Sequence, residues 1–87
     1  MEKINYEYPV VFIKNEESGI FNAFVPDLFV FAESKTQKQA TIEVKMIAKK
    51  FLQMAKKYQT EIPIPSTIED VENKWKGWKV SLMSFAI

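Results

Sequence analysis

The most hydrophobic run of the chain, residues 21–34 (FNAFVPDLFVFAES), is interrupted at its centre by Pro26 and Asp27. Proline has no backbone N–H group and cannot donate to a sheet ladder, so a strand must end or bulge there. Aspartate accepts hydrogen bonds from nearby backbone groups and holds turns. We therefore expect two strands, Ile20–Val25 and Leu28–Glu33, joined by a turn at this dipeptide.

The preceding segment, Tyr8–Lys14 (YPVVFIK), is β-branched and aromatic and has apolar residues in both of its alternating sets. That pattern is typical of a central strand covered on both faces. Residues 15–19 form a turn cluster in which Gly19 can supply a positive φ. The pattern predicts a hairpin between this strand and the next.

Residues 36–58 are predicted to form a long helix, opened by a capping box of Thr36 and Gln39. Its expected core face, spaced at helical intervals, is Ala40, Val44, Ile47, Phe51, Ala55 and Tyr58. Ser66 and Glu69 form a second capping box, which predicts a short helix over about Thr67–Asn73. Gly77 then marks a turn into a last strand, Val80–Ile87.

These elements predict an α+β fold: an antiparallel three- to four-stranded sheet with one long helix packed on it, in the order β-β-β-α-(short α)-β. We expect one domain spanning 1–87, because 87 residues of which 47% are hydrophobic can bury one modest core. We expect no C-terminal DNA-binding domain.

The composition excludes several classes of site. The chain has no cysteine and no histidine, so thiolate metal sites and serine–histidine pairs are ruled out. With only two glycines, no glycine-rich phosphate loop is present. We expect no enzyme activity, no cofactor and no metal. The longest apolar run is shorter than the ~18 residues of a membrane helix, and the N-terminus is too polar for a signal peptide, so a cytoplasmic protein is expected.

Charge is distributed unevenly although the net charge is only +1. Residues 1–33 hold six acids and two lysines, a net of −4; residues 34–58 hold seven lysines and one glutamate, a net of +6. All twelve basic residues are lysine. Without the planar fork of arginine, sequence-specific DNA recognition is disfavoured.

Two surfaces remain open to more than one interpretation. One is a lysine flank on the long helix, which is either a solvated face or a non-specific nucleic-acid surface. It consists of Lys38, Lys45, Lys49 and Lys56. Apolar residues outside the expected helix core, together with the apolar last strand, predict a homodimer or higher homo-oligomer. The predicted oligomer residues are Ile42, Met46, Leu52, Leu82 and Phe85.

The ordered signals resemble the N-terminal domain of HicB-type antitoxins over roughly residues 8–72. The segments that carry the resemblance are Tyr8-Pro9-Val10-Val11-Phe12, Glu16-Glu17-Ser18-Gly19, Val25-Pro26-Asp27-Leu28, Thr36-x-x-Gln39-Ala40 and Ile62-Pro63-Ile64-Pro65-Ser66-x-x-Glu69-Asp70. The resemblance implies a partial RNase H-like fold and a non-catalytic antitoxin role.

The partner implied by this resemblance is HicA, a small basic ribonuclease toxin. A surface that holds RNA is positive, so an inhibitor is expected to offer carboxylates to it. The predicted toxin-binding residues are Glu16, Glu17, Asp27 and Glu33. Two alternatives are a lysine-rich nucleic-acid-binding domain and a solitary oligomeric scaffold without a toxin.

Overall fold

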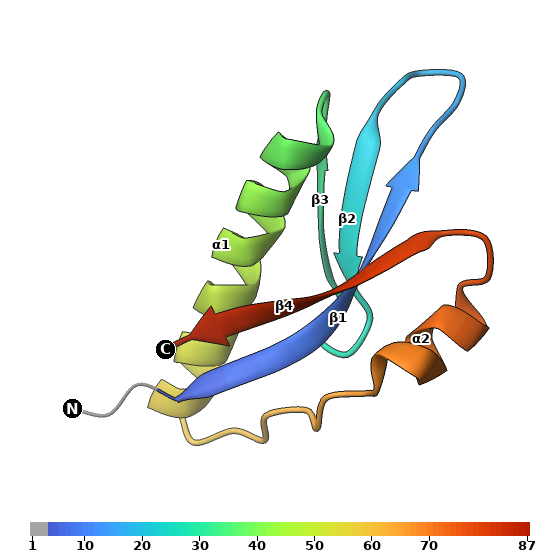
Figure 1. Ribbon diagram of the computed structural model, residues 1–87. Coiled ribbons are helices and arrows are strands. Elements are labelled where there is room, and N and C mark those ends of the chain that lie inside the picture. Colours follow the sequence, from blue (N-terminus) through green and yellow to red (C-terminus); the bar gives the residue numbers. More distant parts are fainter. Residues whose placement is uncertain (1–3) are drawn as a thin grey trace.

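The computed structural model describes residues 4–87. Its four strands form one antiparallel sheet in the order β3-β2-β1-β4 (Figure 1). The elements are β1 Asn5–Lys14, β2 Phe21–Val25, β3 Val30–Ser34, α1 Gln37–Lys57, α2 Ile68–Lys74 and β4 Lys79–Ala86. The predicted α+β class and element order are confirmed. Strand β3 begins two residues later than predicted, because the turn after β2 occupies residues 26–29.

Strand β1 is central, as predicted, and five consecutive residues, 8–12, are buried. The side chains of Tyr8, Val10 and Phe12 join the main core beneath α1. Val11 is also fully buried but lies outside that cluster. Because neighbouring side chains alternate across a strand, Val11 points to the opposite face, where α2 packs against β1 and β4. We call this opposite face the outer face.

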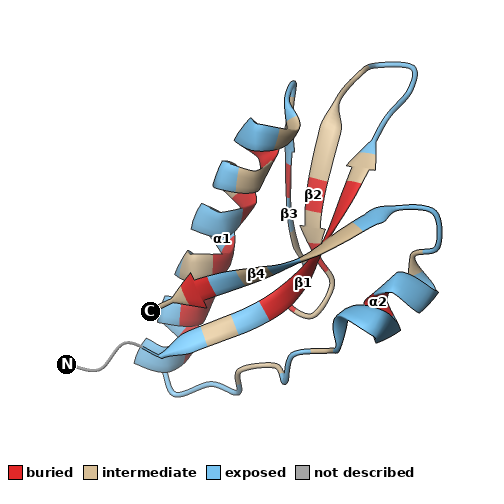
Figure 2. Ribbon diagram, viewed as in Figure 1, coloured by how far each residue is buried: buried red, intermediate tan, exposed pale blue. Residues whose placement is uncertain are grey.

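Helix α1 packs chiefly on β3 and β2, and its buried residues face the sheet (Figure 2). Thr36 caps it as predicted, because its hydroxyl oxygen accepts a hydrogen bond from the Gln39 N–H over 3.1 Å. The helix residues that are buried are Ala40, Val44, Ala48, Leu52 and Ala55.

The predicted core face of α1 is wrong in part. Ile47 and Phe51 are 41% and 38% exposed, and Tyr58 is exposed as well. At 100° per residue the buried stripe is rotated by roughly 40° from the predicted one. The reason lies in the sheet, where bulky side chains such as Tyr8 and Phe85 fill the core and leave room for alanines on the helix.

Two of the predicted oligomer residues are not on the surface. Leu52 and Phe85 are both fully buried within the chain. Phe85 of β4 lies opposite Tyr6 of β1, and the ring centroid of Phe85 is 6.2 Å from that of Tyr8. Neither side chain can therefore contribute to an interface between chains, which corrects their assignment. In the part of the chain that the structure describes, no helix has the length and apolarity needed to cross a membrane.

Candidate partner-binding surface

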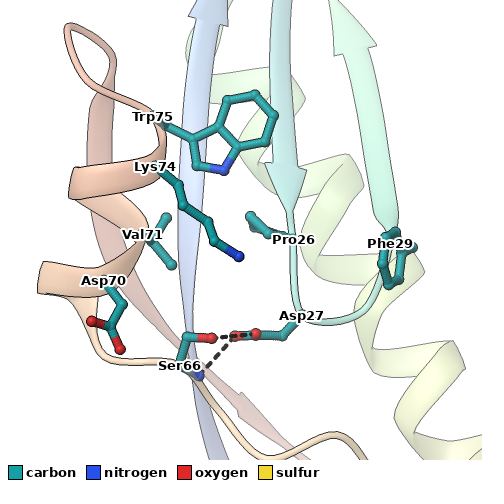
Figure 3. Close-up of a pocket in the computed structure, with 8 residues that line it drawn as sticks. All are labelled: Pro26, Asp27, Phe29, Ser66, Asp70, Val71, Lys74 and Trp75. Carbon is teal, nitrogen blue, oxygen red and sulfur yellow. Dashed lines mark hydrogen bonds between the residues drawn. The ribbon is translucent and has the colours of Figure 1, made fainter.

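Asp27 joins the turn after β2 to the segment that leads into α2 (Figure 3). Its Oδ2 accepts a hydrogen bond from the Ser66 N–H over 2.9 Å, and its Oδ1 accepts one from the Ser66 hydroxyl over 2.6 Å. The two residues are 39 positions apart and partly buried. The proline–aspartate interruption therefore does more than make a turn, because its carboxylate fixes a distant segment. We call this contact the Asp27–Ser66 clamp.

The clamp explains why the second capping prediction is wrong by one residue. Thr67, rather than Ser66, caps α2, and its hydroxyl oxygen accepts a hydrogen bond from the Asp70 N–H over 3.1 Å. The Ser66 hydroxyl is not available to cap because it already donates to Asp27. The capping box recognised from the sequence placed the helix correctly but assigned the cap to the wrong hydroxyl.

A second hydrogen bond holds the segment that leads into α2. The Tyr8 hydroxyl donates to the Pro63 carbonyl oxygen over 2.7 Å. Burial raises the pKa of Tyr8 above its ordinary value of 10.0, and the charges of Asp27 and Tyr6 raise it further. Each of these causes disfavours the phenolate. Tyr8 is therefore a neutral donor throughout the physiological range.

A pocket of about 580 Å³ opens between the Pro26–Phe29 turn and α2 (Figure 3). Its apolar lining consists of Pro26, Phe29, Val71 and Trp75. Its polar lining consists of Asp27, Ser66, Asp70 and Lys74. The lining therefore carries three charged groups, Asp27, Asp70 and Lys74, and both oxygens of Asp27 accept hydrogen bonds from Ser66.

Phe29 is the most unusual residue at this pocket. It has a φ of 55° although it is not glycine, and its side chain is 85% exposed. Left-handed backbone is costly for a bulky side chain, and such strain concentrates at functional sites. A large aromatic residue held in this way without burial is an indicator of a contact surface.

Further aromatic residues extend this surface over the outer face. Phe24 packs edge-on against Trp75, with ring centroids 5.5 Å apart. Phe31 lies opposite Phe24 on β3 and is 58% exposed. We call Phe24, Phe29, Phe31 and Trp75 the aromatic patch. It joins the turn, two strands and the end of α2, so it exists only in the folded chain.

The structure separates the four carboxylates predicted to bind a toxin. Glu16 and Glu17 lie in the exposed β1–β2 hairpin, and Glu33 lies opposite Asn22 near that end of the sheet. Asp27 lies beyond the far end of β2, and five residues of strand span about 17 Å. Three carboxylates thus share one end of the sheet, whereas Asp27 is part of the clamp.

The predicted lysine flank does form one side of α1. Lys38, Lys45 and Lys56 are exposed and Lys49 is partly buried. Helical spacing places them about 180° from Ile47 and Met54. Of the predicted oligomer residues, Ile42, Met46 and Leu82 are exposed, but Leu82 is on β4 whereas the other two are on α1.

The side chains that line this pocket include two aromatic rings, Phe29 and Trp75, two carboxylates, Asp27 and Asp70, the Ser66 hydroxyl and the Lys74 ammonium. Among residues 4–87, no group of three or more carboxylates lies close enough together to hold a metal ion. The Asp27–Ser66 contact resembles part of a catalytic arrangement, but the sequence contains no imidazole to relay a proton from the hydroxyl. Exposed aromatic side chains beside carboxylates suit recognition of another macromolecule.

Sequence reasoning did not select Phe29, Phe31 or Trp75 as functional residues. The exposure of Phe31 could have been predicted from the alternation of side chains along residues 30–32. Ala32 lies in the core, so the neighbouring Phe31 must point outward. The exposure of Phe29 had no comparable signal, since it depends on the left-handed turn.

Comparisons with known proteins bear on the fold of this chain. No protein-family model and no curated protein matches the chain. Among solved structures, the N-terminal domain of antitoxin HicB from Burkholderia pseudomallei superimposes with a TM-score of 0.78. The match covers 90% of this chain and 95% of that one at 17% sequence identity. The chain therefore has the fold of the N-terminal domain of a HicB antitoxin.

Proposed function

We propose that this chain is a non-catalytic, antitoxin-like protein that binds and inhibits a small basic ribonuclease toxin of the HicA type. The observation that carries the proposal is the aromatic patch, in which Phe29 and Phe31 are exposed and Phe24 and Trp75 are half-buried, on a fold shared with a HicB antitoxin. An exposed patch of this kind on a small domain is typical of a protein-binding surface. The fold alone does not indicate which surface binds the toxin, and we propose the aromatic patch as that surface.

Phe29 and Phe31 are the residues we expect to supply most of the affinity. Aromatic side chains dominate the binding energy of protein interfaces when a partner buries them. Phe29 is almost fully exposed before binding and has only two side-chain torsions, so ordering it on binding costs less than ordering a longer side chain. The adjacent pocket offers space for a side chain of the toxin.

The carboxylates have a different task in this proposal. Exposed ion pairs contribute only about 0.2–1 kcal/mol each, so they set orientation and association rate more than affinity. Glu16, Glu17 and Glu33 share the hairpin end of the sheet and give it negative charge. Asp27 is committed to the clamp, and we no longer include it among the residues that contact the toxin.

The experiment is co-expression with a small basic ribonuclease toxin of the HicA type, taken from the reading frame beside this chain's gene if that frame encodes one. The parent chain should restore growth to cells that produce this toxin. Phe29→Ala should fail to restore growth, because it removes a ring that contacts the toxin in this proposal. The ring is exposed, so its removal leaves the core intact. Ile64→Ala is the matched control, since it removes another exposed apolar side chain, one that does not line this pocket. Equal rescue by both variants would remove Phe29 from the interface, and no rescue by the parent would contradict the proposal.

A further inference from the structure

A second surface lies where α1 meets the edge strand β3, on the face of the sheet opposite to Phe31, so it shares only strand β3 with the aromatic patch. A groove of about 360 Å³ is lined there by Ala32, Glu33, Glu43, Met46, Ile47 and Lys50. Met46 is 58% exposed and Ile47 is also exposed. In residues 4–87, β3 pairs with β2 on one side and with no strand on the other. Such an edge combines apolar side chains with unpaired backbone groups.

We propose that a second copy of this chain occupies this groove and forms a two-fold symmetric dimer. The two-fold axis passes between Met46 and Ile47 and places the two α1 helices antiparallel to one another. Position 43 of one helix then faces position 50 of the other, because both are equally far from the axis along the helix. Glu43 of each copy meets Lys50 of its partner copy, so the contact is complementary in charge twice.

The same axis fits the edge strand. Ala32 is the central residue of β3, which runs from Val30 to Ser34. Ala32 lines the same groove as Met46 and Ile47. An axis through Ala32 would pair the two β3 strands antiparallel and join the two sheets into one of eight strands. The middle of the strand and the middle of the helix residues that line the groove thus lie beside one another, as a single two-fold axis requires.

The spacing of the elements allows this arrangement. Helix α1 packs on both β2 and β3, so its axis lies about half a strand spacing inside β3. The two-fold axis lies half a spacing outside β3, where the partner strand would pair. With strands about 4.8 Å apart, the two helix axes would be roughly 10 Å apart. Packed helices lie about 8–10 Å apart, so Met46 and Ile47 of both copies would meet.

Charge favours a second copy over the basic toxin as the occupant of this groove. A basic partner would be attracted by Glu43 but repelled by Lys50, seven residues further along the same flank. Only a partner with the same two charges in reverse order satisfies both, and an antiparallel copy has them. The pairing also closes the β3 edge with two-fold symmetry, so no further strand can add at that edge.

The dimer is independent of the proposed antitoxin role, and charge reversal tests it. Sedimentation equilibrium should show a dimer for the parent chain. Glu43→Lys and Lys50→Glu should each raise the dimer dissociation constant about tenfold to a hundredfold, because each turns two attractions into two repulsions. Lys45→Glu is the matched control: it makes the same charge change on the opposite flank of α1 and should leave the constant unchanged.

Mixing the two variants gives the sharpest result. An equimolar mixture of Glu43→Lys and Lys50→Glu should form a heterodimer with a dissociation constant within about threefold of the parent value, because every facing pair is again opposite in charge. Loss of folding in either variant could not produce this recovery. Hydrogen exchange should show β3 amides protected in the parent and in the mixture but not in the separate variants. A parent that is monomeric at 100 µM, or variants that dimerise as tightly as the parent, would overturn the proposal.

Discussion

Replacing Asp27 should destabilise the fold by an amount that its two contacts allow us to calculate. The carboxylate accepts hydrogen bonds from the Ser66 N–H and hydroxyl at 2.9 and 2.6 Å. A hydrogen bond to a charged group contributes about 1.5–3 kcal/mol, and the lower end applies because both residues are only partly buried. At about 1.5 kcal/mol for each of the two hydrogen bonds, we expect Asp27→Ala to lower the free energy of unfolding by about 3 kcal/mol.

Two further variants separate the geometry of the clamp from its charge. Asp27→Asn should cost only about 1 kcal/mol, because its amide oxygen still accepts from the Ser66 N–H while its NH₂ donates to the hydroxyl oxygen. Ser66→Ala removes the hydroxyl contact alone and should cost about 1–1.5 kcal/mol. The double variant with Asp27→Ala should be less destabilised than the sum of the two single variants, because they remove the same contact.

Urea unfolding followed by tryptophan fluorescence is the appropriate assay. Trp75 ends α2 and packs on Phe24, so its emission reports whether α2 is docked on the sheet. A loss below about 0.5 kcal/mol for Asp27→Ala, in the range of ordinary surface substitutions, would show that the clamp contributes nothing. Equal losses for Asp27→Ala and Asp27→Asn would show that charge, rather than geometry, is responsible.

Three further predictions follow from the core, the buried phenol and the charged hairpin. Leu52→Ala should lower the free energy of unfolding in urea by about 2–5 kcal/mol, and Phe51→Ala by less, because only Leu52 is fully buried; the reverse order would contradict the observed helix face. The pKa of Tyr8 is raised in the folded state, so the contribution of the neutral phenol to stability is present below about pH 10 and is lost as the pH rises further. The free energy of unfolding of Tyr8→Phe should therefore decline less above that pH than that of the parent. An identical decline would refute the raised pKa of Tyr8. Converting Glu16, Glu17 and Glu33 to lysine should slow association with the toxin in stopped-flow measurements at low salt, and an unchanged rate would exclude steering by these carboxylates.

The strands and helices could be predicted from the sequence because their signals are local. Pro26 stops β2, Gly19 closes its hairpin with a φ of 73°, and Thr36 caps α1, each through contacts with near neighbours. The rotation of α1 could not be predicted. Leu52 and Phe51 are adjacent and equally apolar, and only the shape of the sheet beneath decides which of them is buried.

The candidate site was predictable only in part for the same reason. The acidic residues were evident from composition, but the clamp that engages Asp27 joins positions 39 residues apart. No local pattern distinguishes a turn aspartate from one that fixes a distant connector. Phe29 is exposed because of a left-handed backbone conformation, and aromatic residues give no sequence signal for that conformation.

The most direct test of the central claim is inhibition of a purified ribonuclease toxin of the HicA type. We predict that the parent chain, added in equimolar amount, stops RNA cleavage, and that Phe29→Ala requires about 30-fold more protein, as expected for the loss of ~2 kcal/mol from a central aromatic contact. Ile64→Ala should inhibit as the parent does. Undiminished cleavage in the presence of excess folded parent chain would contradict the account.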